Sequence, residues 1–160
     1  MPDFIIIQEQ SLPEIIEVEK PENQTVIEVM TGIQGPPGAA GGVSFFKEAY
    51  ENVGGQRIVV LNSDDKIGYA SSDNINHIGI VVGMTKTAAI IGDTVEVVNN
   101  IIIEDVSWSL EPYKPVFLST NGIITQNIEG AILFVLSVGV ALSPTKIYLK
   151  QSQPIRRQNG

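Results

Sequence analysis

The stretch IVVLNSDDKIGYA, residues 58–70, is echoed later in the chain by PVFLSTNGIITQ, residues 115–126. Each stretch begins with an apolar run, passes through a turn rich in Asn, Asp or Gly, and returns to apolar residues. Leu61 matches Leu118 in this comparison, and the second turn is one residue shorter. Because Asn, Asp and Gly adopt positive φ at little cost, both turns predict tight hairpins. The two stretches therefore predict the beginnings of two copies of one β-rich repeat.

Each copy continues with the same order of elements. An apolar strand containing a glycine follows the hairpin, with Gly83 matching Gly139, and an alternating strand then closes the copy. The predicted strands and their counterparts are HIGIVVGMT (77–85) with FVLSVGVAL (134–142), and DTVEVV (93–98) with TKIYLK (145–150). Short strands separated by turn signals are typical of small all-β domains. We expect a mainly β fold with a small duplicated β-barrel or sandwich over residues 55–153.

The segment before this repeat has a different composition. Residues 1–42 hold seven acidic residues and one lysine, a net charge of −6 out of −8 for the whole chain. IIEVE (15–19) and VIEV (26–29) partly alternate apolar with acidic residues, which is typical of strands with one solvated face. Two such strands are too few and too charged to form a core of their own. Residues 1–31 therefore predict an extended arm that pairs with another protein.

A collagen-like pattern joins the arm to the rest of the chain. TGIQGPPGAAGG, residues 31–42, spells three consecutive Gly-X-Y triplets, one of them Gly-Pro-Pro. Glycine at every third residue is required where three polyproline-II chains meet at an axis that only glycine fits. Three triplets span about 28 Å, so they need flanking domains that hold three chains in register. The pattern favours a homotrimer, and a flexible linker in a monomer is the alternative. The expected trimerisation residues of this linker (32–42) are Gly32, Gly35, Pro36, Pro37, Gly38 and Gly41.

Two short segments flank the predicted repeat. VSFFKEAYEN, residues 43–52, has apolar residues at spacings that suit a short amphipathic helix. We therefore expect residues 43–54 to form a short helical connector between the linker and the repeat. Residues 154–160 are expected to be a tail.

The residue inventory argues against an enzyme. The chain has no cysteine, which excludes disulfides, thiolate metal sites and thiol nucleophiles. His77 is the single histidine, so a multi-histidine metal site is excluded, and a structural role is favoured over a catalytic one. The acidic pair in SDD (63–65) has a metal-binding and a turn interpretation, and its match to TNG in the second copy favours the turn. No cofactor and no metal are expected.

Charge and hydropathy limit the kinds of partner that the protein can bind. The net negative charge argues against nucleic acid. The most apolar stretch, AILFVLSVGVALSP (131–144), is shorter than the roughly 20 residues that a membrane helix needs. The beginning of the sequence lacks a basic segment and a long apolar run, so no secretory signal is expected. We expect a soluble protein that binds other proteins.

One aromatic cluster has two interpretations. Trp108 lies in EDVSWSLEPYKPVFL, close to Tyr113 and two prolines. An aromatic beside proline-rich turns suits a platform for sugars or peptides. The favoured interpretation is a core anchor that covers one mouth of a small barrel, because Trp108 is the only tryptophan.

Taken together, these segments resemble the head-fibre and capsid-decoration (cement) proteins of tailed bacteriophages. The resemblance covers about residues 31–155, and its markers are GGQRIVVLNSD, GYASSDN, IGIVVGMT, WSLEPYKPVFL and VGVALSPTKIYL. Such proteins are typically trimers on the exterior of the capsid and carry no catalytic residues. The resemblance implies a virion structural protein whose partners are the major capsid protein and the host cell surface. Decoration proteins often lack a collagen-like linker whereas fibres use one, so head and tail locations both stay open.

The resemblance also implies a role for the acidic arm. Its strands are expected to add to the sheets of capsid subunits, its acids to meet basic side chains, and three arms to raise the avidity. The alternative function is a tail-fibre-associated module that recognises a bacterial surface glycan, with Trp108 and Tyr113 as an aromatic shelf. The expected capsid-anchoring residues are Ile15, Glu17, Val18, Glu19, Val26, Ile27, Glu28 and Val29.

Overall fold

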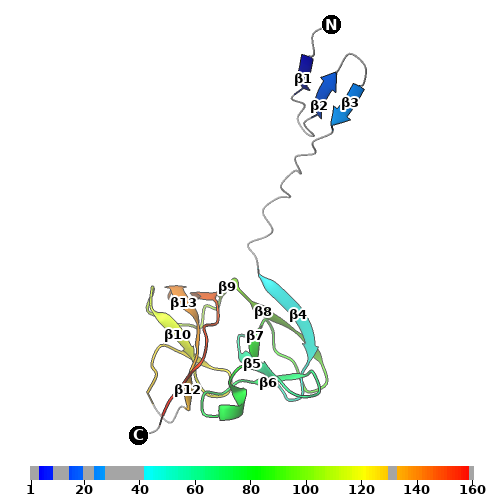
Figure 1. Ribbon diagram of the computed structural model, residues 1–160. Coiled ribbons are helices and arrows are strands. Elements are labelled where there is room, and N and C mark those ends of the chain that lie inside the picture. The colour runs from blue at the N-terminus through cyan, green and yellow to red at the C-terminus, as the bar shows by residue number, and fades with distance from the viewer. Residues whose placement is uncertain (1–3, 9–14, 20–23, 28–41, 130–132, 159–160) are drawn as a thin grey trace. The chain divides into compact units, whose positions relative to one another are not determined.

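The structure, a computed structural model, describes residues 4–8, 15–19, 24–27, 42–129 and 133–158. The chain divides into two units, residues 1–40 and residues 41–160 (Figure 1). Within the described residues the regular structure is β-strand, apart from the single 3-10 turn η1 (Ile75–His77). The predicted mainly β fold is therefore confirmed. No helix in this described part of the chain is long and apolar enough to cross a membrane.

The N-terminal unit contains a three-stranded antiparallel sheet. Its order is β1-β2-β3, formed by β1 (Phe4–Gln8), β2 (Ile15–Glu19) and β3 (Gln24–Ile27). The predicted strand at 15–19 is confirmed, and the one at 26–29 overlaps β3. The prediction of an extended arm is wrong for these residues, because the strands pair with one another. Antiparallel pairing satisfies the backbone groups of β2 on both sides and those of β1 and β3 on the side that faces β2.

Two five-stranded antiparallel sheets make up most of the C-terminal unit. The first has the order β4-β8-β7-β5-β6 and the second has the order β11-β10-β13-β14-β9. The strands of the first sheet are β4 (Val43–Glu48), β5 (Ile58–Leu61), β6 (Ile67–Tyr69), β7 (Val81–Thr85) and β8 (Thr94–Asn99). The strands of the second are β9 (Ile101–Glu104), β10 (Pro115–Leu118), β11 (Ile124–Thr125), β13 (Ser137–Ser143) and β14 (Lys146–Leu149). A two-stranded sheet joins β12 (Phe134–Val135) to β15 (Ile155–Arg156), which lies within the segment expected to be a tail.

The two large sheets have the same strand order. In each sheet the first strand along the chain (β4 or β9) pairs with the last one (β8 or β14), and the hairpin strands follow in matching places. Val59 lies opposite Gly83 and Val116 lies opposite Gly139, and a register shift follows directly in both. This agrees with the predicted match of the two glycines.

The turns of the two copies have the same length, contrary to the prediction of a shorter second turn. Leu61 pairs with Ile67 and Leu118 pairs with Ile124, so equal numbers of residues separate the paired positions. The predicted turn chemistry is present in both copies, with φ of 60° at Asp65 and 52° at Asn121.

Neither sheet closes into a barrel in the described part of the chain. The second sheet ends at β9 and β11. The first sheet ends at β4 and β6, whose ends meet through one parallel bridge between Ala49 and Ile67. A single bridge is not a continuous ladder of hydrogen bonds. Of the two predicted architectures, the sandwich of two packed sheets agrees with the structure and the closed barrel does not.

The predicted helix at 43–54 is wrong, because Val43–Glu48 forms β4, antiparallel to β8. The apolar residues of this segment match a helical period and a strand period about equally well, and six residues are few for a helix. Valine and phenylalanine favour strands. Phe45 packs against the first-sheet cluster that contains Val95 and Val97, whereas Phe46, on the opposite face, is exposed.

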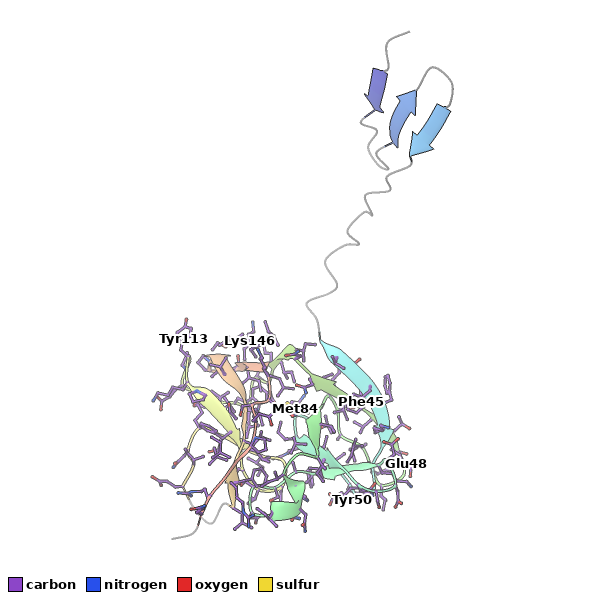
Figure 2. The ribbon with its side chains drawn as sticks, viewed as in Figure 1. Phe45, Glu48, Tyr50, Met84, Tyr113 and Lys146 are labelled. Atoms are coloured by element: carbon purple, nitrogen blue, oxygen red, sulfur yellow. The ribbon has the colours of Figure 1, made fainter. Side chains whose placement is uncertain are left out.

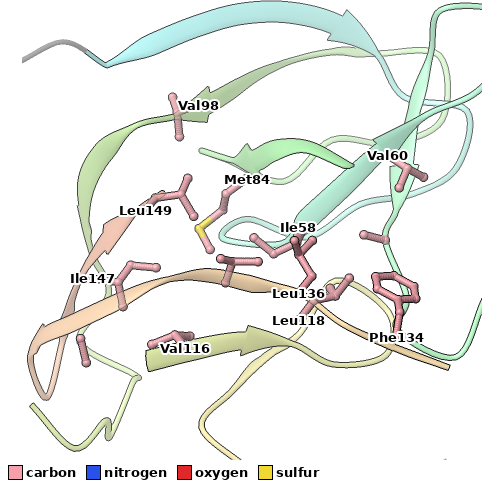
Figure 3. Packing of buried hydrophobic residues seen from close by; sticks show 13 residues of the cluster. Ile58, Val60, Met84, Val98, Val116, Leu118, Phe134, Leu136, Ile147 and Leu149 are labelled. Atoms are coloured by element: carbon pink, nitrogen blue, oxygen red, sulfur yellow. The ribbon is translucent and has the colours of Figure 1, made fainter. Parts of the chain in front are cut away.

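The core has two parts. The larger cluster lies between the two sheets, where Ile58, Val60 and Met84 of the first meet residues of the second (Figure 3). The second-sheet members are Val116, Leu118, Val138, Ala141, Ile147 and Leu149. The smaller cluster lies on the other face of the first sheet and includes Val59 and Ile67. The first sheet therefore buries both of its faces, which explains its nearly continuous apolar strands.

Candidate interaction surfaces

The acidic turn of the first hairpin does not resemble a metal site. The Asp65 carboxylate pairs with the Lys47 ammonium group. Asn62 closes the turn, because its Oδ1 accepts hydrogen bonds from the backbone N–H of Asp64 at 3.0 Å and of Lys66 at 2.9 Å. The turn interpretation of residues 63–65 is therefore confirmed. Among the residues that the structure describes, no group of three or more acidic or histidine side chains is placed to hold a metal ion.

His77 is held by its neighbours in the loop between β6 and β7. Its Nδ1 accepts a hydrogen bond from the backbone N–H of Ser71 at 2.9 Å, and its Nε2 lies 3.0 Å from Nδ2 of Asn74. Burial lowers the pKa of His77 below its usual value, while the Asp73 carboxylate opposes that shift. Because Nδ1 must be unprotonated to accept from Ser71, protonation there would break this contact. The geometry favours a structural role for His77.

Trp108 and Tyr113 do not share one surface. Trp108 is partly buried and packs against the core between the two sheets, in agreement with the anchor interpretation. Tyr113 is 85% exposed, has a φ of 64°, and lies at the tip of the loop before β10 (Figure 2). The hollow that Trp108 helps to line also includes Arg57, Asp105 and Ile124, without Tyr113. The described residues therefore offer no shelf formed by these two aromatics.

The N-terminal sheet limits how its residues can anchor the protein. β2, which carries Glu17 and Glu19, is the central strand, and both of its edges are paired by β1 and β3. A partner strand can therefore be added at β1 or β3, but not at β2. Ile15 and Val18 also belong to β2, and the anchoring role expected for them stays a prediction from the sequence.

Val26 and Ile27 belong to β3, where a partner strand can be added. Glu28 and Val29, also expected to anchor the arm, lie outside the described residues. The expected trimerisation residues, from Gly32 to Gly41, lie outside them as well. Their trimerising role stays a prediction from the sequence.

Sequence reasoning missed an exposed apolar surface on β4 and β9. Phe46 is 66% exposed and Ile102 is 56% exposed. Beside Ile102 is a groove of about 230 Å³, lined by Val98, Ile101 and Ile103 and bordered by Gln56, Lys86 and Glu104. We call Phe46, Ile102 and this groove the β4–β9 surface. Read as a strand, VSFFKE places Phe45 and Phe46 on opposite faces, but the sequence does not show which of the two is covered.

No family model and no curated protein matches the sequence. Among solved structures, the chain is similar to the crystal structure of head fiber gp8.5 N base in bacteriophage phi29, with a TM-score of 0.41 and 16% identity. The alignment covers 74% of this chain and 100% of that one. A similarity this low carries no argument about fold or function.

Proposed function

We propose that this chain is a non-enzymatic structural protein of a tailed-bacteriophage virion, a capsid-decoration or head-fibre protein that assembles as a homotrimer. The N-terminal sheet attaches to the major capsid protein on the exterior of the shell and bridges its subunits. The C-terminal unit projects outward, toward the host cell surface. The proposal involves no cofactor, membrane or nucleic acid.

One observation carries the proposal. Three consecutive Gly-X-Y triplets stand between a strand-forming acidic segment and a two-sheet unit that is packed by its own core. A collagen-like run of this length makes physical sense as a neck between units that hold three chains together. A collagen-like neck suits a trimeric fibre, whereas a monomeric enzyme has no use for one. The resemblance of residues 31–155 to head-fibre and decoration proteins supports the same function.

The N-terminal unit suits attachment to a protein surface. Its sheet leaves the edges of β1 and β3 for pairing with strands of a partner, and the segment through residue 42 carries a net charge of −6. A basic or mixed protein surface would complement that charge. The glycan-binding alternative needs an exposed aromatic shelf, and no observation on Trp108 or Tyr113 favours it.

The neck is tested by substituting valine at one of two adjacent positions, 38 or 39, in the full chain. We expect wild type to have three times the 17.3 kDa chain mass in light scattering. Gly38→Val places a side chain at the crowded axis. It should raise the concentration at which the trimer half-dissociates by at least tenfold. Ala39→Val adds a larger side chain to the same triplet away from the axis and should leave the trimer unchanged. Equal effects of the two variants would contradict a collagen-like neck.

Attachment to the capsid is tested with virions of the phage that encodes the chain. Removing residues 1–30 should abolish co-sedimentation with shells, because it removes β1, β2 and β3. A full-length Glu17→Gln, Glu19→Gln variant should bind several-fold more weakly than wild type at low salt and about equally at high salt. The matched control is Glu111→Gln, Glu129→Gln in the C-terminal unit. Undiminished co-sedimentation of the chain lacking residues 1–30 would overturn the anchoring role.

A further inference from the structure

The β4–β9 surface continues a face that is otherwise buried. In the first sheet, Met84 pairs with Val98 and Val98 pairs with Ser44, so these three residues lie on one face. The second sheet covers Met84 and Val98, which belong to the core between the sheets. Farther along β4, Phe46 lies on this same face, opposite Glu96, and is 66% exposed. Phe46 pairs with Glu96, and Glu96 pairs with Lys86 at the border of the groove. Single exposed apolar residues are common, whereas an apolar patch with a polar rim is typical of a surface that binds a protein.

The surface also lies at the free edges of both sheets. Within the described sheets, β4 pairs with β8 and ends the first sheet, and β9 pairs with β14 and ends the second. The groove lies where these edge regions meet, since Val98 of β8 and Ile102 of β9 both line it. Long edge strands with exposed apolar side chains are a risk for aggregation unless something covers them.

The charges on this surface are arranged in pairs. Lys86 Nζ lies 3.1 Å from a carboxylate oxygen of Glu96, between Phe46 and the groove. Glu104, at the border of the groove, has an oxygen 3.5 Å from Lys146 Nζ. Because each of these two acids has a basic neighbour, the charges that border the surface add little like-charge repulsion when two copies meet.

The position of β4 in the sequence brings the same surface close to the proposed neck. Gly41 is the last glycine of the Gly-X-Y run, and Phe46 follows it by five residues. Five residues of fully extended chain span at most about 17 Å. If three chains wind about one axis up to Gly41, three copies of Phe46 are held within about 17 Å of the end of that axis.

We propose that the β4–β9 surface is the contact between neighbouring copies of the chain at the base of the neck, with Phe46 of one copy packed into the groove beside Ile102 of the next. This inference rests on the proposed trimer. A ring of three copies requires a head-to-tail contact between two different patches. Phe46 and the groove are two such patches on one chain.

The test compares serine substitutions in the full chain. Phe46→Ser and Ile102→Ser should each raise the concentration at which the trimer half-dissociates by at least tenfold, measured by light scattering on dilution. Ile90→Ser is the matched control, because Ile90 is 63% exposed, close to the value for Phe46. Ile90 lies near the other end of β4, where Gly92 N–H donates to the carbonyl of Ala49. The control should leave the dissociation unchanged.

A second measurement does not depend on dissociation. Since the chain has no cysteine, Phe46→Cys and Ile90→Cys each introduce a single thiol. Above the dissociation concentration, maleimide should alkylate the thiol at position 46 at least tenfold more slowly than the thiol at position 90. Below it, the two rates should become similar.

The outcomes separate this inference from the proposed function. A wild-type chain that stays monomeric at every concentration overturns the trimer and this contact together. A wild-type trimer whose dissociation is unchanged by Phe46→Ser and Ile102→Ser, with equal alkylation at positions 46 and 90, overturns the contact alone. In that case the neck and the N-terminal sheet hold the trimer, and the β4–β9 surface faces solvent.

Discussion

Phe134→Ala is expected to lower the free energy of unfolding by about 3–5 kcal/mol, the usual cost of truncating a fully buried phenylalanine. The Phe134 side chain has no exposed surface and belongs to the cluster between the two sheets (Figure 3). Its truncation removes apolar contacts and leaves a cavity in a core to which both sheets contribute. Denaturant titration at one fixed protein concentration measures this loss, so that any linkage to assembly is the same for each variant.

The control for this prediction is the next residue in the same strand. Val135 is only partly buried and lies on the opposite face of β12. Val135→Ala should therefore cost about 1 kcal/mol or less. Both substitutions leave the backbone pairing of β12 with β15 intact, so a difference between them reports side-chain packing. Similar losses for both variants would contradict the placement of Phe134 in the shared core.

Turns and repeats were the features most accessible from the sequence. Asn121 with Gly122, and Asp64 with Asp65, predict turns through the backbone conformations these residues tolerate, and the turn is formed by their own few residues. The match of Gly83 with Gly139 is accessible for a similar reason, because each copy must meet the same steric demand at the same place. These features depend on residues close together in the sequence, so they can be predicted from short stretches of it.

Features that depend on distant pairing were missed. Val43–Glu48 reads as a helix because its apolar spacing suits both periods, and only the partner β8, some 50 residues later in the sequence, decides for a strand. Ile101–Glu104 follows a turn signal, Asn99 with Asn100 at a φ of 59°, but its place as the first strand of the second sheet depends on its pairing with β14, more than 40 residues later. Ile155–Arg156 forms a strand only because β12 offers it an edge. The prediction of a closed barrel fails for the same reason. Whether β4 and β6 form a full ladder or the single bridge between Ala49 and Ile67 depends on how the two edges meet in space.

The candidate surfaces divide in the same way. The Gly-X-Y pattern is visible in the sequence because a collagen-like triple helix requires glycine at every third residue. Phe46 is not visible, because exposure depends on where the second sheet ends. Trp108 could be predicted as an anchor from its size alone, whereas the separation of Tyr113 from it follows from the loop before β10.

Gly139→Ala is expected to lower the free energy of unfolding by about 3 kcal/mol, the upper end of the usual cost of overpacking. A Cβ at Gly139 would lie 2.2 Å from the carbonyl oxygen of Tyr148 on the adjacent strand. Because that oxygen belongs to the backbone of a paired strand, it can move away only if the ladder between β13 and β14 is distorted. A flexible side chain at the same distance would cost much less.

The repeat predicts that Gly83→Ala behaves in the same way. Its Cβ would lie 2.5 Å from the carbonyl oxygen of Val98, on the strand of the first sheet that corresponds to β14 of the second. Gly54→Ala is the control, since the nearest atoms to its Cβ are side-chain atoms of Arg57 at 3.5 Å, an ordinary contact distance. Thermal or denaturant unfolding should therefore show large losses at positions 139 and 83 and a change within about 0.5 kcal/mol at 54. A large loss at one of the two equivalent glycines and none at the other would mean that the copies share their strand order but not the close strand contact that requires glycine.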